Sequence, residues 1–270
     1  MCSYCPQKIL IKNYKKLSSK LIMTFDDFKL YLNNIPNDYI ITFGGFSEPF
    51  LNPDMLRMLL YAYDCGYKLD LFTTLVGITK QDILSMGSAE IDFDRAVVHL
   101  PNINEHFMDK KEYLYLLDLF CNNISIGKLE FEYFGFVDDD IVDLLLKHGY
   151  SPFCGTMSSR GGYVYVPKYQ IGGGFCATGH ENHHILLPSG DVVLCCMDFG
   201  CKHVLGNLKD DNINDLNFKK PFIDIKKKQR LNDSDIICRK CDEFIPFFSL
   251  RFFNFIMSKF HKFFIKLKEV

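Results

Sequence analysis

Eleven cysteines stand among the 270 residues of this chain, and six of them have the spacing of metal or iron–sulfur ligands. These six are Cys2, Cys5, Cys176, Cys195, Cys238 and Cys241. The first two and the last two each form a C-x-x-C pair, and the middle two flank Gly190 in the order C-x13-G-x4-C. Four thiolates from a hairpin and a distant turn suit a tetrahedral site, which the spacing allows to be zinc or a [4Fe–4S] cluster.

The cysteine count and the first residues also indicate the compartment. An odd number of cysteines cannot all form intramolecular disulfides. The chain does not open with a basic stretch followed by the apolar run of a secretory signal. We therefore expect a cytoplasmic protein with reduced thiols. Its formal net charge of −2 gives no basic face for nucleic acid, so no nucleic-acid partner is expected.

A second group of candidate residues lies in the stretch FGGFSEPFLNP at 43–53. Gly44 and Gly45 let the backbone approach a ligand closely, and Ser47 and Glu48 supply oxygen acceptors. A ligand with a positively charged amine would suit this loop. The alternative is a tight turn with a solvated glutamate.

Alternating strand-like and helical stretches in the first half would position these residues. Short apolar or aromatic runs predict strands at 39–45, 68–74, 95–101 and 128–135. Capping signals at Thr24 and Thr79, among others, predict helices at 25–35, 54–65, 80–86 and 138–149. This alternation predicts an α/β fold with a parallel sheet. If the sheet curls into a full or partial barrel, its chemistry lies at the strand ends.

The sequence after residue 170 predicts a small second module. The stretch PSGD at 188–191 joins two apolar runs as a hairpin, and a helical stretch and ICRKCD follow. Alternation along VVLCC sends Cys195 and Cys196 to opposite faces, so only one of them should reach the metal site. Three further cysteines lie in helix or strand patterns and are expected to be buried: Cys65, Cys121 and Cys154.

Three other polar residues have both a structural and a functional reading. His99 lies at a predicted strand end facing the barrel mouth, where a rim histidine and a substrate contact are both possible. Glu130 and Glu132 alternate along one strand and so share a face that is expected to reach the barrel interior. Paired carboxylates there are costly unless they bind something.

Taken together, CSYC, the GGFSEP loop and the late C-x13-G-x4-C with its C-x-x-C resemble radical S-adenosylmethionine (radical SAM) enzymes that carry a SPASM or shorter twitch domain. The resemblance runs to Asp242. It implies a partial (β/α)6-type parallel barrel over 1–169 and a SPASM/twitch module of a β-hairpin plus helix over 170–243. The remaining residues, 244–270, are predicted from their own pattern to form a basic amphipathic tail helix. The resemblance further implies a catalytic [4Fe–4S] cluster on Cys2 and Cys5, and an auxiliary one on Cys176, Cys195, Cys238 and Cys241.

The resemblance also implies contacts with S-adenosylmethionine. The backbone near Tyr4 would meet adenine. The amino group would be held by Gly45, Phe46, Ser47 and Glu48. Four later residues occupy places suited to the ribose and carboxylate: Thr73, Thr74, Ser159 and Arg160. Ordinary strand-end threonines and a surface arginine are the alternative reading of these four.

The match departs from the family at its first cysteine. In the family, three cysteines spaced C-x-x-x-C-x-x-C hold the first cluster, and Cys2 and Cys5 match the second and third. The first would precede Met1. We expect Met1 to be an internal residue of a longer protein, because the strand before the cysteine loop is also missing and the sheet would have an unpaired edge. A degenerate family member is the alternative.

The implied activity is reductive cleavage of S-adenosylmethionine to a 5′-deoxyadenosyl radical, which abstracts hydrogen from a peptide or sugar-type substrate. The implied partners are that substrate and a reductant such as flavodoxin or ferredoxin. A non-catalytic iron–sulfur electron carrier and a structural zinc protein are the alternatives from other classes.

The tail at 248–268 alternates phenylalanines with basic residues. Placed on a helix, its apolar residues gather on one side: Phe252, Phe253, Ile256, Phe260, Phe263, Phe264 and Leu267. Its uncharged runs are too short to span a bilayer. The pattern predicts peripheral contact with an anionic membrane surface or a partner, or else packing on the barrel of the chain itself.

Overall fold

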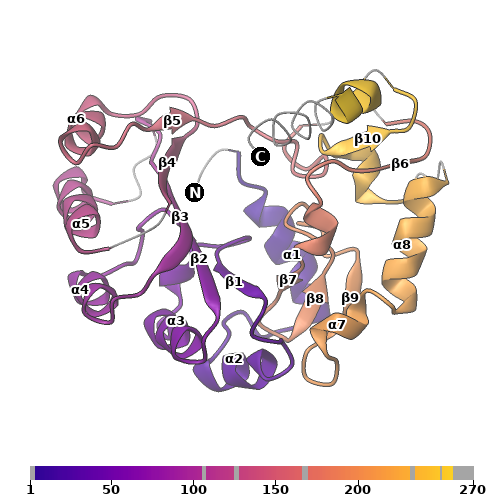
Figure 1. Cartoon of the computed structure of the whole chain (residues 1–270), viewed down its shortest axis with the longest axis horizontal. Coiled ribbons are helices and arrows are strands. Elements are labelled where there is room, and N and C mark those ends of the chain that lie inside the picture. The colour runs from indigo at the N-terminus through magenta and orange to yellow at the C-terminus, as the bar shows by residue number, and fades with distance from the viewer. Residues whose placement is uncertain are drawn as a thin grey trace, which may run out of the picture.

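A computed structural model gives the arrangement of the chain (Figure 1). The structure describes residues 4–104, 108–124, 128–165, 170–231, 235–249 and 251–257. The predicted ligand Cys2 and the tail beyond 257 therefore lie outside the described residues. A curved sheet with helices on its outer side occupies one half of Figure 1, and a smaller β-rich part occupies the other.

Five parallel strands form the main sheet in their sequence order. They are β1 (Ile40–Phe43), β2 (Lys68–Thr73), β3 (Phe93–His99), β4 (Leu129–Tyr133) and β5 (Phe153–Cys154). The register sets Thr42 opposite Asp70 and His99 opposite Glu132. Parallel strands that pair in chain order, with helices between them, have the topology of an opened barrel. The predicted α/β partial barrel is thus confirmed, with five strands in the described residues.

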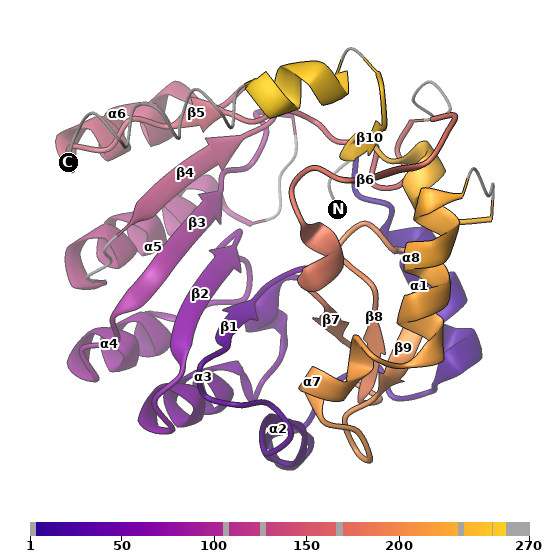
Figure 2. The ribbon, with the colours of Figure 1, turned by 45° about the vertical axis from the view of Figure 1, so that its right-hand side comes forward.

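Helices connect these strands and cover the outer face of the sheet (Figure 1). They are α2 (Phe25–Leu32), α3 (Met55–Asp64), α4 (Lys80–Ser88), α5 (Lys110–Asn123) and α6 (Asp139–Lys147), with a short 3-10 turn η1 (Pro49–Leu51). Thr24 and Thr79 are N-caps that exchange hydrogen bonds with Asp27 and Asp82, as capping boxes do. The helix α1 (Gln7–Leu17) was not predicted, and Figure 2 shows it beside the smaller part.

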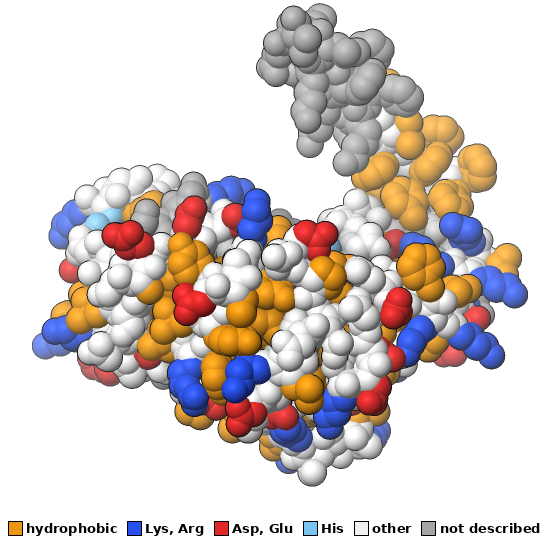
Figure 3. Space-filling view, turned by 60° about the horizontal axis from the view of Figure 1, so that its bottom comes forward, with side chains coloured by type: hydrophobic (Ala, Val, Ile, Leu, Met, Phe, Trp, Pro, Cys, Tyr) orange, Lys and Arg blue, Asp and Glu red, His pale blue; other side chains and the backbone are white. Residues whose placement is uncertain are grey.

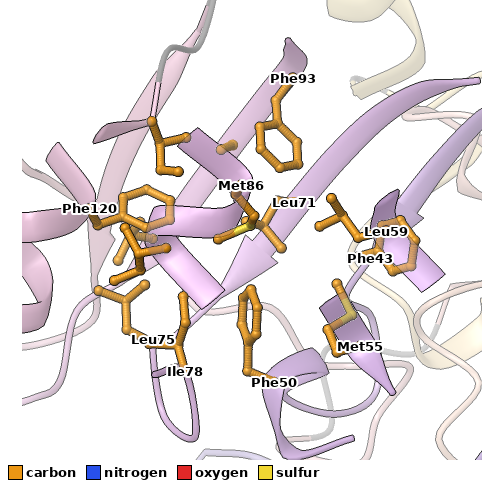
Figure 4. Packing of buried hydrophobic residues seen from close by; sticks show 14 of the residues in the cluster. Phe43, Phe50, Met55, Leu59, Leu71, Leu75, Ile78, Met86, Phe93 and Phe120 are labelled. Carbon is orange, nitrogen blue, oxygen red and sulfur yellow. The ribbon is translucent and has the colours of Figure 1, made fainter. Parts of the chain in front are cut away.

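The main core lies between the sheet and its outer helices (Figure 4). Leu69 and Leu71 of β2 point into it and are fully buried, while the alternate residues Asp70 and Phe72 face the other way. The same alternation along β3 and β4 leaves polar side chains on the inner, concave face of the sheet. Packing on the helix side of the sheet therefore stabilises the fold, whereas the polar side chains of the inner face are placed to contact a ligand.

The smaller part is built from short antiparallel strands. β7 (Ile185–Leu186), β8 (Asp191–Val193) and β9 (Val204–Asn207) form one sheet, and β6 (Gly174–Cys176) pairs with β10 (Phe244–Pro246). Its helical segments are η2 (His180–Asn182), α7 (Ile213–Leu216), α8 (Lys220–Arg230) and η3 (Ile237–Lys240). β7 and β8 pair across 188–191, so the predicted hairpin is confirmed.

The two parts share side chains across their junction. Tyr31 of α2 is fully buried in the core of the smaller part, against residues such as Val192 and Leu216. Asn34 donates its side-chain amide to the carbonyl of Leu208 at 2.9 Å. The smaller part is therefore fixed against the barrel through α2.

Candidate functional site

Four of the predicted cysteine ligands line one cavity in the smaller part: Cys176, Cys195, Cys238 and Cys241. One lies on β6, one follows β8, and two lie at η3, so three segments distant in sequence supply them. Three are buried and Cys176 is partly exposed. A [4Fe–4S] cluster occupies the volume between its cysteines, and thiols around one cavity fit that group. Within the ranges the structure describes, no three His, Cys, Asp or Glu side chains are grouped as for a single metal ion.

Gly190 makes the turn that presents Cys195. Its φ of +91° is in the left-handed region, and an added Cβ would lie 2.6 Å from Asn207 Oδ1 and 2.9 Å from the Tyr31 ring. Any other residue would be strained by its backbone and would collide with its neighbours. The glycine of the C-x13-G-x4-C spacing is thus required by the hairpin itself.

Burial controls the protonation of these thiols. It raises the pKa of Cys238 to about 11 and that of Cys241 to about 12. It also raises the pKa of Cys195 well above its usual value. Without a cluster these side chains are neutral thiols at pH 7, and cluster binding must release their protons.

Two polar side chains that the sequence did not single out share this cavity, His180 and Glu181 of η2. The ring Nδ1 of His180 lies 3.8 Å from Cys196 Sγ, and burial lowers the pKa of this histidine. Cys195 lines the cavity, whereas Cys196 is directed to His180. Only one cysteine of the adjacent pair thus lines the cavity, as predicted, although both lie in the segment after β8 and not on the strand whose alternation was the reason for the prediction.

The carboxylate of Glu48 anchors the glycine-rich loop to the end of β2. One oxygen accepts from Thr73 Oγ1 at 2.8 Å and from the Phe50 backbone N–H at 3.2 Å. The other accepts from the Thr74 N–H at 2.6 Å and from Thr74 Oγ1 at 2.7 Å. The structure therefore brings three predicted cofactor residues together, but they bind one another. The predicted contact of Glu48 with an amine stays a prediction.

The other loop residues have distinct surroundings. Gly44 follows β1, and a Cβ there would lie 2.8 Å from Phe72 Cβ, so only glycine permits this close approach. Gly45 and Ser47 are exposed, whereas the Phe46 ring is buried 4.6 Å from the Phe199 ring. Phe46 thus packs the loop against the smaller part, and the exposed residues beside it remain accessible to a ligand.

The N-terminal residues reach the same end of the sheet. The Tyr4 ring lies 5.1 Å from the ring of Phe134, which follows β4. Burial raises the pKa of the Cys5 thiol, and the Gln7 backbone and the positive charge of Arg160 partly offset that rise. Cys5 and Arg160 are therefore electrostatic neighbours, although 155 positions separate them in the sequence.

Ser159 holds the loop that carries Arg160. Its backbone N–H donates to the Asp242 carboxylate, and its hydroxyl donates to the Lys240 carbonyl at 3.1 Å. Ser159 is fully buried, and Arg160 is half-buried with a φ of +48°. The charge of Arg160 also acts on Cys196. This loop is thus fastened to the C-x-x-C segment, and the positive charge of its arginine acts to lower the pKa of both Cys5 and Cys196.

The inner face of the sheet carries the predicted His99, Glu130 and Glu132. Glu130 pairs with Arg95 at 2.6 Å. His99 Nδ1 lies 3.2 Å from Glu132 Oε2 without hydrogen-bond geometry. Aromatic rings lie on both sides of His99, Phe72 at 6.2 Å and Phe134 at 6.3 Å between centroids. The two carboxylates share the inner face, as predicted, and each has a basic neighbour.

The prediction that Cys65, Cys121 and Cys154 are buried is wrong for two of them and only partly right for the third. Cys65 and Cys154 are exposed and Cys121 is half-buried. Cys65 is exposed because it is the C-cap of α3, beyond the last helical turn that packs on the core. Cys154 lies on the short last strand of the sheet, where both residues of the strand are exposed.

The described start of the tail is helical over 251–257. Phe252 packs near Phe175 of β6, at 6.3 Å between ring centroids, while Phe248 and Phe253 are 84% and 53% exposed. Figure 3 shows hydrophobic side chains gathered at its upper right, at this end of the described chain. The predicted amphipathic tail beyond 257 lies outside the described residues. In the part of the chain that the structure covers, no helix has the length and apolarity needed to cross a membrane.

Comparisons with known proteins agree with this geometry. Residues 176–242 match the SPASM family, described as an iron–sulfur cluster-binding domain. The fold is similar to that of BtrN, a radical SAM enzyme, in its complex with AdoMet and 2-DOIA. The TM-score is 0.56 at 15% identity, over 89% of this chain and 87% of BtrN. A second BtrN structure, in an open conformation, has a TM-score of 0.45 at 13% identity, over 82% of this chain and 84% of BtrN. The sequence matches no curated protein.

Residues 176–242 thus match a SPASM iron–sulfur domain, and the chain as a whole has a fold similar to that of BtrN. The resemblance seen in the sequence is therefore confirmed for the fold of the chain and for its iron–sulfur domain. The four cysteines of the cavity all fall within the matched segment.

Proposed function

We propose that this protein is a radical SAM enzyme with one catalytic and one auxiliary [4Fe–4S] cluster. The observation that carries the proposal is the convergence of Cys176, Cys195, Cys238 and Cys241 on one cavity inside the SPASM segment. When bound, the catalytic cluster supplies the electron that cleaves S-adenosylmethionine to a 5′-deoxyadenosyl radical, which removes hydrogen from the substrate. Cys2 and Cys5 are proposed to hold that cluster.

The other residues at the barrel mouth would bind and orient S-adenosylmethionine. Arg160 is suited to its carboxylate, because a guanidinium forms paired hydrogen bonds with carboxylates and the charge of this one acts on Cys5. The exposed backbone at Gly45 and Ser47 is suited to the amino group. Glu48 would act mainly by fixing this loop, since each of its two carboxylate oxygens already accepts two hydrogen bonds. The backbone at Tyr4 is proposed to contact adenine.

The substrate is proposed to bind on the inner face of the sheet and to be of a peptide or sugar type. The charged and hydrogen-bonding groups there, among them Arg95, His99 and Glu132, favour a polar molecule rich in hydroxyl or amide groups. The structural relative BtrN contains both AdoMet and 2-DOIA, which supports a small substrate beside the cofactor. A flavodoxin or ferredoxin is proposed as the reductant.

Anaerobic reconstitution with iron and sulfide tests this function directly. We expect about eight iron atoms per chain in a protein with both sites complete, and about four when only the auxiliary site fills. Adding S-adenosylmethionine should change the electron paramagnetic resonance of one cluster only.

Two cysteine variants and the metal content complete this test. Cys195→Ala should lose the auxiliary iron, whereas the exposed Cys65→Ala should keep it. A single tightly held zinc would establish the structural-zinc alternative. Iron clusters whose spectra do not change when S-adenosylmethionine is added would establish the non-catalytic electron-carrier alternative.

A further inference from the structure

A connected set of polar side chains lies against the cysteine cavity. Gln229 of α8 is 1% exposed, and its Nε2 lies 3.4 Å from Cys238 Sγ and 3.3 Å from Glu181 Oε2. Glu181, 8% exposed, lines the same cavity. Its other oxygen accepts a hydrogen bond from Lys226. Lys226 and Gln229 are three positions apart on one helix, so both face Glu181.

The orientation of the Gln229 amide follows from its neighbours. A carboxylate oxygen and a sulfur both accept hydrogen bonds, so the NH2 group and not the carbonyl must face them. The two N–H bonds of that group are thus directed to a predicted cluster ligand and to a buried charge. Burying a carboxylate is costly unless it is paired. The contacts from Lys226 and Gln229 offset the cost of burying the Glu181 carboxylate. The second N–H of Gln229 is left for the sulfur of Cys238.

We propose that Gln229 and Glu181 set the reduction potential of the auxiliary cluster, in opposite directions. This inference rests on the proposed function, because it needs a cluster on Cys238 and its three partners. An N–H donated to a ligand sulfur stabilises the more negative, reduced state and raises the potential. The Glu181 carboxylate on the cavity wall repels the added electron and lowers the potential, and Lys226 moderates that charge. Both are positioning residues, since neither is a predicted ligand.

The test is a redox titration followed by electron paramagnetic resonance on the reconstituted full chain. A Cys5→Ala background removes the signal of the first cluster. Gln229→Leu should lower the midpoint potential, and Glu181→Gln should raise it. The control is Lys227→Gln, which changes an exposed charge on the same helix. Each of the two shifts should correspond to about a tenfold change in the equilibrium constant for reduction, or about 59 mV for one electron.

The outcomes separate this inference from the function on which it rests. If the chain with intact cysteines takes up no auxiliary iron, the proposed function fails. If iron content is full but both variants titrate like the control, or shift the other way, the tuning role is wrong. Should Gln229→Leu lose iron, Gln229→Met keeps the length of the side chain without an N–H. Should that variant lose iron too, the Glu181→Gln shift decides, and an unchanged or lowered potential refutes the proposal.

Discussion

Replacing Glu48 by Gln tests whether this carboxylate anchors the glycine-rich loop. The amide has nearly the same shape, but one oxygen becomes an NH2 group that cannot accept a hydrogen bond. Each oxygen of Glu48 accepts one backbone N–H, from Phe50 or from Thr74, and one threonine hydroxyl. Whichever oxygen is replaced, one backbone N–H therefore loses its acceptor and the remaining bonds lose the help of the negative charge.

The expected cost follows from these contacts. A hydrogen bond to a charged group contributes about 1.5–3 kcal/mol, so the variant should lose about 2 kcal/mol of unfolding free energy. For a domain of about this size that corresponds to a fall in Tm of about 4–8 °C. Thermal unfolding followed by circular dichroism would measure it. Glu90→Gln, the same change at an exposed site, is the control.

The same variant separates anchoring from direct binding. A loop that is only loosened should lose stability and bind S-adenosylmethionine less tightly, while both clusters assemble. An unchanged Tm together with an affinity about tenfold lower would show that Glu48 meets the amine directly, since tenfold is about 1.4 kcal/mol. An unchanged Tm and an unchanged affinity would refute both roles.

Three further predictions follow from single residues. Arg160→Ala should weaken S-adenosylmethionine binding about tenfold or more in equilibrium dialysis, whereas the exposed Arg57→Ala should not; equal affinities would remove the carboxylate contact. Burial raises the pKa of Cys121 to about 12, so at pH 9 iodoacetamide should alkylate it about 500-fold slower in the folded than in the unfolded chain. Because the unfolded chain releases this proton first, Cys121 should also lower stability as the pH rises from about 9 to 12; equal alkylation rates by peptide mass spectrometry would contradict the shift. Vesicles rich in anionic phospholipid should sediment the protein, and Phe248→Ser with Phe253→Ser should weaken this, since each buried phenylalanine contributes about 1.5–3 kcal/mol. Phe218→Ser, at 79% exposure in the smaller part, is the control, and sedimentation that survives the paired substitution would exclude the tail.

The sequence predicted those helix starts and turns that depend on residues close together in the chain. Thr24 and Thr79 begin helices because each shares a capping box with an aspartate three residues later. The hairpin at 188–191 follows from Gly190 and its turn. The helix α5 was missed, although Asp109 caps it with Glu112 three residues on, and that pair could have revealed it.

The candidate site was predictable where a motif marked it and not elsewhere. The four SPASM cysteines were found by their spacing, and the structure brings them to one cavity. Gln229 has no such signal, because its role comes from lying beside Cys238 after the helix has packed. Glu48 shows the opposite case. The residue was found from the sequence but its hydrogen bonds were not, since Thr73 and Thr74 lie at the end of β2, 25 and 26 positions away. Contacts between segments that are distant in the chain could not be predicted from the sequence alone.

The place of Tyr31 has a consequence for how the chain is made. Its ring completes the core of a part whose strands begin more than 140 residues later, at 174. At a synthesis rate of about 5–20 residues per second, those partners appear about 7–30 s after the tyrosine leaves the ribosome. During that interval α2 can pack its inner residues on the nascent barrel while Tyr31 remains uncovered. The growing chain therefore carries an exposed aromatic side chain until the SPASM hairpin arrives, and chaperones or premature association would act in that interval.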